Sequence, residues 1–328
     1  MLGVRAGRVT ATAAVVVAML AVSAAPAAAA GTAPGRPVFA KLTLTLPDAF
    51  QVSHQLVTVS GRTVHIHGVI RPYVAGQWVL IRAFRGGKQF RTDHLRIKPG
   101  PGGSGQFTEA LASSKPGRVT VQVGHTRNAA LGGMIERRTF SALDENASFG
   151  SSGLFVQLIQ QRLAALHLYI PQTGVYDGGT GLALDAYHRL LHWGTYQTLD
   201  GRTVSFLLDG FGQFPVRFPH NGRHAEGNLG LQLLALVDGS NVVAIYPISS
   251  GKPSTPTILG NFRVYSKVPG YLPDGMYFSN FFTGGYAVHG YNPAPDYPAS
   301  HGCMRLPIVD AISVYNWLAL GDWVDTYY

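Results

Sequence analysis

The chain has 328 residues, enough for two or three domains, and only 13% of them are charged. Its 40 glycines and 20 prolines predict many turns and β-rich structure, so we expect a multidomain, mainly β fold. The formal net charge of +9 favours an anionic partner. Nucleic acid is not expected as that partner, because the sequence has no basic and aromatic module typical of nucleic-acid recognition.

The N-terminus has the pattern of a secretory signal. Arg5 and Arg8 precede an apolar run over 11–22, and an alanine-rich stretch follows. This order of charged, apolar and small residues predicts a signal peptide over 1–30. The apolar run is shorter than the about 20 residues of a membrane-spanning helix, so we favour cleavage over an uncleaved anchor. Residues 31–37 are rich in glycine, proline and alanine and form the expected linker.

The segment 38–143 is predicted to form an immunoglobulin-like, antiparallel β-sandwich, because apolar residues recur with a period of two between glycine-rich turns. His65 and His67 would share one strand face, but two ligands without a third seldom hold a metal, so no metal is expected. The expected strands are 41–46, 57–59, 63–67, 78–84 and 119–123. Six basic residues surround a hairpin and form a solvated face or a binding face: Arg82, Arg85, Lys88, Arg91, Arg96 and Lys98.

A polar stretch over 144–153 marks the next boundary, and 150–210 is predicted to be a small helical module. Thr180 is the expected cap of its second helix, and 204–208 predicts a short third helix. The first helix has apolar residues at helical spacing, namely Phe155, Leu158, Ile159, Leu163 and Leu166.

The last domain, 215–328, is predicted to be a β-rich sandwich or barrel with one helix. Pro307 suits the first turn of that helix, and Ile308, Ile312 and Tyr315 are its expected apolar stripe. The expected strands are 233–237, 242–246, 262–266, 276–279, 286–288 and 322–327.

The only cysteine of the chain lies in this last domain, close to two histidines. Cys303 is two residues from His301, and His289 ends a predicted strand upstream. A thiol is a strong nucleophile only as the thiolate, and an imidazole can take its proton. An exported protein with a single cysteine cannot form an internal disulfide, so the thiol is expected to serve a function. The alternative is a buried cysteine that acts as a small apolar residue.

The motif Ser300-His301-Gly302-Cys303-Met304-Arg305, preceded by His289-Gly290, resembles the active-site signature of the L,D-transpeptidase family. The resemblance extends over the last domain and includes 254–257 and 284–290. Two positions depart from the family pattern, since Tyr291 replaces the usual threonine and the turn at 257–260 is longer. The helical module more weakly resembles a peptidoglycan-binding module, through Gln157-Leu158, Gln160 to Leu163, Gly174 to Tyr176, Thr180 and Ala186 to His188. Glycan binding and a rigid spacer both stay open for this module.

The resemblance implies acyl transfer through a thioester on peptidoglycan stem peptides, without a cofactor. Cys303 is then the expected nucleophile, and His289 the general base, while His301 orients the loop or the substrate. The amides of Gly302 and Cys303 could form an oxyanion hole, and the start of the following helix could favour the thiolate. The expected substrate-binding residues are Arg305, which suits a carboxylate, Ser300 and Tyr286.

Several alternatives stay open. If water accepts the acyl group, the same residues make an L,D-carboxypeptidase. A non-catalytic wall-binding structural protein is a second alternative, although the motif is intact. A secreted cysteine protease is not supported, because no asparagine or aspartate orienter pattern is present. The expected partners are peptidoglycan stem peptides and glycan, with anionic wall polymers as a further candidate for the basic protein, which would act in the cell wall outside the membrane.

Overall fold

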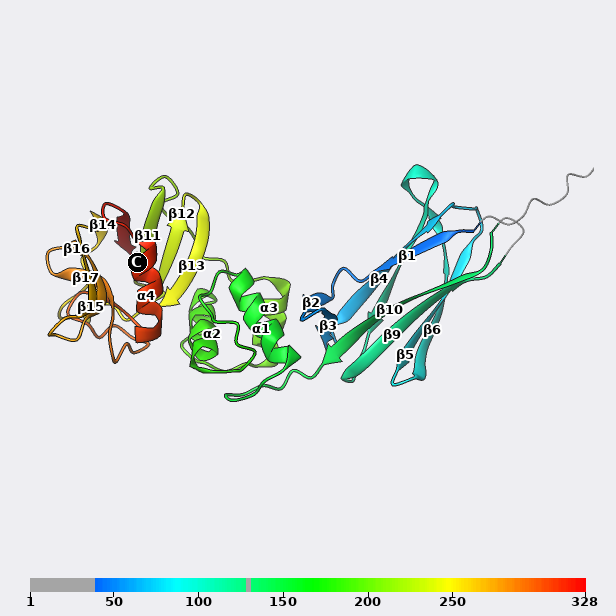
Figure 1. The fold of residues 1–328 in the computed structure, drawn as a ribbon, viewed down its shortest axis with the longest axis horizontal. Coiled ribbons are helices and arrows are strands. Elements are labelled where there is room, and N and C mark those ends of the chain that lie inside the picture. The colour runs from blue at the N-terminus through cyan, green and yellow to red at the C-terminus, as the bar shows by residue number, and fades with distance from the viewer. Residues whose placement is uncertain (1–38, 128–130) are drawn as a thin grey trace, which may run out of the picture.

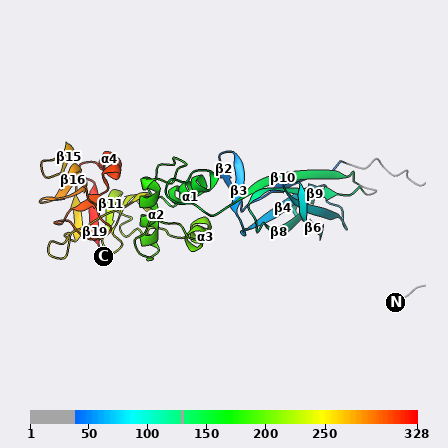
Figure 2. The same ribbon diagram turned by 90° about the horizontal axis from the view of Figure 1, so that it is seen from below.

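The computed structural model describes residues 39–127 and 131–328. The predicted signal peptide and linker therefore lie outside the described residues. Three folded parts follow one another along the long axis, a β-sandwich, a helical module and a second β-rich domain, and two perpendicular views agree on this order (Figures 1 and 2). Within the described part of the chain, no helix is long and apolar enough to cross a membrane.

The N-terminal part is a sandwich of two sheets, as predicted. Its core contains the inward residues of both sheets, such as Ile66, Phe107 and Val121. The pairing is antiparallel except that β10 and β3 run parallel, which the sequence analysis did not foresee. The first sheet has the order β1-β4-β8-β7, with β1 Lys41–Thr45, β4 Thr63–Arg71, β8 Gly105–Ala112 and β7 Lys98–Pro99. The second has the order β2-β3-β10-β9-β5-β6, with β2 Phe50–Val52, β3 Gln55–Val59, β10 Met134–Leu143, β9 Gly117–His125, β5 Trp78–Arg85 and β6 Lys88–Arg96; a 3-10 turn, η1, covers Pro101–Gly103.

The middle part has the three predicted helices, α1 Leu154–Ala165, α2 Gly178–Leu190 and α3 Gly201–Asp209. Thr180 is not the cap of α2. Asp177 is the cap, because its carboxylate accepts a hydrogen bond of 2.9 Å from the Thr180 N–H, as capping carboxylates do.

The core of the helical module is continuous with both neighbouring domains. Val57 of the sandwich and Leu233 of the last domain belong to the same buried cluster as Leu158 and Tyr187. Arg62 also forms a 2.7 Å ion pair with Asp209 across the first boundary. The helical module therefore packs directly against both β domains.

The last domain consists of two sheets and one helix, α4 Ile308–Trp317. Its core joins the two sheets and α4 through residues such as Ala225, Val288, Met304 and Val314. The first sheet has the order β13-β12-β11-β19-β14, with β13 Asn241–Pro247, β12 Leu233–Asp238, β11 Arg223–Asn228, β19 Trp323–Tyr327 and β14 Gly260–Arg263. The second has the order β15-β16-β17-β18, with β15 Ser266–Tyr271, β16 Tyr277–Thr283, β17 Tyr286–Gly290 and β18 Met304–Leu306.

Two predictions for this domain were wrong. Ile312 is 41% exposed, and α4 instead buries Asp310, Ala311 and Val314. The expected strand over 262–266 is divided, because β14 ends at Arg263 and β15 begins at Ser266 in the other sheet.

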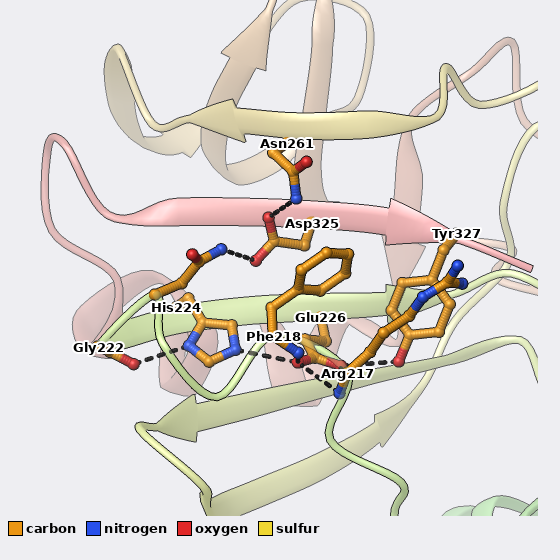
Figure 3. Close-up of polar contacts among 9 residues, drawn as sticks. Arg217, Phe218, Gly222, His224, Glu226, Asn261, Asp325 and Tyr327 are labelled. Atoms are coloured by element: carbon orange, nitrogen blue, oxygen red, sulfur yellow. Dashed lines mark hydrogen bonds and ion pairs between the residues drawn. The ribbon is translucent and has the colours of Figure 1, made fainter.

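A buried polar network fixes the chain segment that enters the last domain (Figure 3). The carboxylate of Glu226 on β11 accepts hydrogen bonds from the N–H groups of Arg217 and Phe218 and from the Tyr327 hydroxyl, at 2.7 to 3.0 Å. His224 donates both ring N–H groups, one to the Gly222 carbonyl and one to Glu226. Burial opposes charge on this pair, but these hydrogen bonds raise the pKa of His224 and lower that of Glu226. The network lies on the first sheet, whereas the cysteine lies at the second.

Candidate active site

Cys303 is positioned by the parallel pairing of β17 and β18. His289 is opposite Arg305, and Cys303 immediately precedes β18, beside Ala287. The N–H of Ala287 donates to Cys303 Sγ at 3.4 Å, and the thiol donates to the carbonyl of Gly285 at 3.7 Å. Because side chains alternate along a strand, Ala287 and His289 point to the same face. The register thus brings the thiol to the face of the sheet that carries His289.

The ring of His289 is held in one tautomer. Its Nδ1 lies 2.9 Å from the Gly290 carbonyl oxygen, which only accepts, so Nδ1 carries the proton. Nε2 therefore keeps a free lone pair. His289 is 2% exposed, and this burial lowers its pKa to about 4. The imidazole is neutral at pH 7, as a general base must be.

The thiol of Cys303 is protonated in the resting protein. Burial raises its pKa, while the Ala287 N–H and the charge of Arg305 act in the opposite direction. The expected help from the helix N-terminus is absent, because β18 separates Cys303 from Ile308, the first residue of α4. The resting pair is thus a neutral thiol and a neutral imidazole, and a thiolate must form as the substrate reacts.

Ser300 shapes the loop that carries the cysteine. Its hydroxyl donates to the Cys303 carbonyl at 2.6 Å and accepts the Gly302 N–H at 3.0 Å. Ser300 is 1% exposed, so its predicted contact with substrate is corrected to a role inside the loop. The Gly302 N–H is occupied by the same hydroxyl, which leaves the Cys303 N–H as the better candidate for the oxyanion hole.

Gly302 is required by both its conformation and its surroundings. Its φ of +120° lies in the region that favours glycine, and a Cβ there would lie 1.9 Å from Cε1 of Tyr286. The half-buried ring of Tyr286 therefore covers the turn before Cys303. The predicted role of Tyr286 in binding substrate stays a prediction.

Arg305 and Cys303 lie two residues apart, and their side chains point to the same face of β18. The guanidinium is half-buried and stacks on the Tyr291 ring, 4.0 Å from its centroid. Among residues 39–127 and 131–328, Arg305 forms no ion pair, so its charge is available for a substrate carboxylate. Tyr291, which replaces the usual threonine of the family pattern, therefore packs its ring against the guanidinium of this arginine.

His301 contacts a lysine. It is exposed, and its Nε2 lies 3.3 Å from Lys252 Nζ. The role of His301 in orienting the loop or the substrate stays a prediction. Lys252 itself was not predicted as a site residue, since a single lysine after a glycine carries no sequence signal.

Asp274 is a further residue that sequence reasoning missed. Burial sets the direction of both pKa shifts, downward for His289 and upward for Cys303, and the charge of Asp274 adds a smaller upward contribution to each. It lies in a turn between β15 and β16, where Asp-Gly is an ordinary turn signal, so nothing in the sequence distinguished it.

No group of three or more histidine, cysteine, aspartate or glutamate side chains could hold a metal ion in the part of the chain that the structure describes. Of the histidines in the sandwich, the two considered above as a metal pair each contact another side chain: His65 pairs with Asp48 at 2.8 Å, and His67 contacts Thr108.

A thiol and a buried neutral imidazole positioned by two paired strands, with an arginine opposite the imidazole, are suited to nucleophilic acyl transfer. The L,D-transpeptidase catalytic domain, the family also called YkuD, matches residues 223–325. A crystal structure of an L,D-transpeptidase from Xylanimonas cellulosilytica is 30% identical, with a TM-score of 0.50, over 55% of this chain and 97% of that chain. The chain therefore belongs to the L,D-transpeptidase family, whose members act on peptidoglycan stem peptides, and it is an enzyme.

Two other solved structures are less similar. An L,D-transpeptidase from Stackebrandtia nassauensis is 18% identical over 56% of this chain and 95% of that chain, with a TM-score of 0.36. An L,D-transpeptidase from Mycobacterium tuberculosis is 21% identical over 33% of this chain and 58% of that chain, with a TM-score of 0.31. A comparison with curated proteins found no match.

Proposed function

We propose that the protein cross-links peptidoglycan by L,D-transpeptidation, with Cys303 as the nucleophile. The observation that carries this proposal is the register of β17 and β18, with the thiol beside Ala287 and the neutral His289 two residues further along the same face. A cysteine buried only for packing would not need a base in a fixed tautomer beside it.

The reaction follows from these groups. Cys303 Sγ attacks the carbonyl carbon of a stem peptide as its proton passes to Nε2 of His289. The Cys303 N–H stabilises the oxyanion, and the intermediate then expels the terminal D-alanine, whose amine takes the proton from His289. The thioester is opened by a side-chain amine of a neighbouring stem, which forms the cross-link and restores the thiol. Arg305 binds a carboxylate of the stem, and Tyr286 lines the site.

Purified protein incubated with tetrapeptide muropeptides is expected to give cross-linked dimers with release of D-alanine. Mass spectrometry of the separated products measures the outcome. The opposing activity is the L,D-carboxypeptidase reaction, in which water opens the thioester and only tripeptides appear. Tripeptides without dimers, at high muropeptide concentration where an amine competes best with water, would contradict transpeptidation while retaining the cysteine chemistry. If neither product forms, the non-catalytic alternative is favoured.

We also propose that the protein acts outside the membrane and contacts anionic wall polymers through the sandwich. Residues that alternate with the buried Val79, Ile81 and Ala83 point away from the core, and the outward residues of β5, β6, β9 and β10 include Arg82, Arg96, Arg118 and Arg137. None of these four forms an ion pair with any residue that the structure describes. A hollow of about 550 Å³ beside Arg82 opens on the same face. The predicted basic stretch is thus divided, since Arg91 instead pairs with Asp93 and Glu109.

The double variant Arg82→Glu/Arg137→Glu is expected to bind isolated cell walls several-fold more weakly at low salt, because opposite charges on the exposed face are replaced by repulsion. Co-sedimentation with walls measures the bound fraction, and high salt should weaken wild-type binding. Lys41→Glu/Lys98→Glu is the control, with the same charge change on the other sheet. Equal binding by the two double variants would contradict a role for this face.

A further inference from the structure

The helical module reaches the catalytic loop through one buried arginine. Arg189 on α2 is 5% exposed, and its guanidinium forms a 2.5 Å ion pair with Asp185. It also donates hydrogen bonds across the domain boundary to the carbonyls of Gln232, at 2.8 Å, and Ile248, at 3.1 Å. A buried arginine that satisfies main-chain carbonyls of another domain holds that backbone in place, because charged hydrogen bonds are stronger than neutral ones.

Gln232, whose carbonyl accepts a hydrogen bond from Arg189, is the first residue of a series of hydrogen bonds that leads to the catalytic loop. Gln232 has a φ of +53°, an unfavourable conformation for a residue with a side chain, so it needs surrounding contacts to persist. Its side-chain amide donates to Ser250 Oγ at 2.7 Å, and its amide oxygen accepts the Ser250 N–H at 2.9 Å. Gln232 therefore fixes Ser250 through both its backbone and its side chain.

Ser250 then connects directly to the loop that carries the cysteine. Its carbonyl accepts the N–H groups of Ala299 and Ser300, both at 2.9 Å. The hydroxyl of Ser300 in turn donates to the Cys303 carbonyl and accepts the Gly302 N–H. The neighbouring Ser249 exchanges two backbone hydrogen bonds of 2.9 Å with Arg305, so this segment borders β18 on the side away from β17.

We propose that Arg189 is a positioning residue for the reaction, which makes the helical module part of the working enzyme. Through Gln232, Ser250 and Ser300 it holds the backbone of the loop at Cys303, including the N–H assigned to the oxyanion hole. The inference rests on the proposed function, because it assigns a purpose to the geometry around Cys303. It also gives a physical reason why the module packs into one continuous core with the last domain.

The test compares two reactions of the same thiol. Acylation by a β-lactam, a strained cyclic amide, develops an oxyanion and depends on the position of the loop, whereas alkylation by a small neutral reagent does not. Arg189→Met is expected to slow acylation by roughly tenfold to a hundredfold, since displacement of about 1 Å at a reacting centre costs up to about 10²-fold. Alkylation should stay within a few-fold of wild type, with an unchanged pH profile. Arg189→Lys, which retains the charge beside Asp185, should recover part of the loss.

Two further variants distinguish a positioning role of Arg189 from a general loss of folded structure. Asp185→Asn/Arg189→Met removes both members of the ion pair, so that no unpaired charge is buried, and should show the same selective loss of acylation. Arg202→Met, in the same module but on the exposed part of α3, should acylate as wild type does. Unchanged acylation in the Arg189 variants, or an equal fall in acylation and alkylation, would overturn the inference. Absence of acylation in the wild-type protein would instead contradict the proposed function.

Discussion

Replacement of Cys303 by serine is expected to abolish the covalent adduct that a β-lactam or a stem peptide forms with the protein. The neutral imidazole of His289 can take a proton from a thiol much more easily than from a hydroxyl, whose pKa is far higher. Since burial lowers the pKa of His289 to about 4, the imidazole is a weak base and cannot compensate for a poorer nucleophile. Intact-mass spectrometry after incubation measures the adduct directly.

The serine variant is expected to keep the fold of the wild-type protein. Sγ takes part in two hydrogen bonds, with Ala287 and Gly285, and a hydroxyl can make both. The thermal unfolding midpoint is therefore expected to stay close to that of wild type. Because Cys303 is the only cysteine of the chain, no other thiol can account for an adduct. An adduct of equal yield on the serine variant would exclude Cys303 as the nucleophile.

Much of the site could be predicted because its residues are adjacent in sequence. The Ser300 to Arg305 motif identifies the cysteine from sequence alone. The steric need for glycine at 302 could not be predicted, because it comes from the ring of Tyr286, which only the structure places there. The role of Ser300 could not be predicted, because its exposure depends on Ser250 and Gln232, which are distant in sequence.

The segments of β1, β3, β4, β5 and β9 were predicted because their period of two is a local property, whereas β2, β6, β7, β8 and β10 were not. The parallel pairing of β3 with β10 joins segments far apart in the chain. The buried face of α4 was misjudged for a related reason. Its pattern is apolar on several sides, so Ile312 and Val314 are equally acceptable from sequence, and only the sheet beneath selects Val314. Asp310, buried with a pKa raised by desolvation to about 7, breaks the rule that charged residues face water, so no pattern could place it inside.

The burial of Arg189 could not be predicted either, because it depends on a neighbouring domain. On α2 it has the spacing of an ordinary i,i+4 pair with Asp185, which usually indicates an exposed helix face. Here both side chains are at most 6% exposed because the last domain packs on them. The sequence of the helical module alone therefore gives no sign that Arg189 donates hydrogen bonds to the backbone of the last domain, at Gln232 and Ile248.

His289→Ala is expected to slow acylation at pH 7 by about 10²–10⁴-fold, the usual contribution of a general base. The thiol of Cys303 is protonated at this pH because burial raises its pKa, so without the imidazole no group on β17 accepts the proton. The loss should diminish as pH rises through the pKa of the thiol, since hydroxide then generates the thiolate without a base. Stopped reactions analysed by intact mass, over a range of pH, measure both rates.

The pH dependence of wild-type acylation at acidic pH also tests whether His289 is the general base. Only neutral imidazole accepts a proton, so the rate must fall as pH drops through the pKa of the base. Because burial lowers the pKa of His289 to about 4, that fall is expected near pH 4, well below the value of about 6.5 of an unperturbed histidine.

The matched control is therefore His301→Ala, the other histidine of the motif. It should retain the acid limb near pH 4 and the pH profile of Cys303 alkylation, while its contact with Lys252 is lost. A change confined to the apparent affinity for muropeptides would agree with a role in orienting the loop or substrate. If His301→Ala shifted the alkylation profile upward and His289→Ala left it unchanged, the two roles would be exchanged, and the base would be the exposed histidine two residues from the thiol.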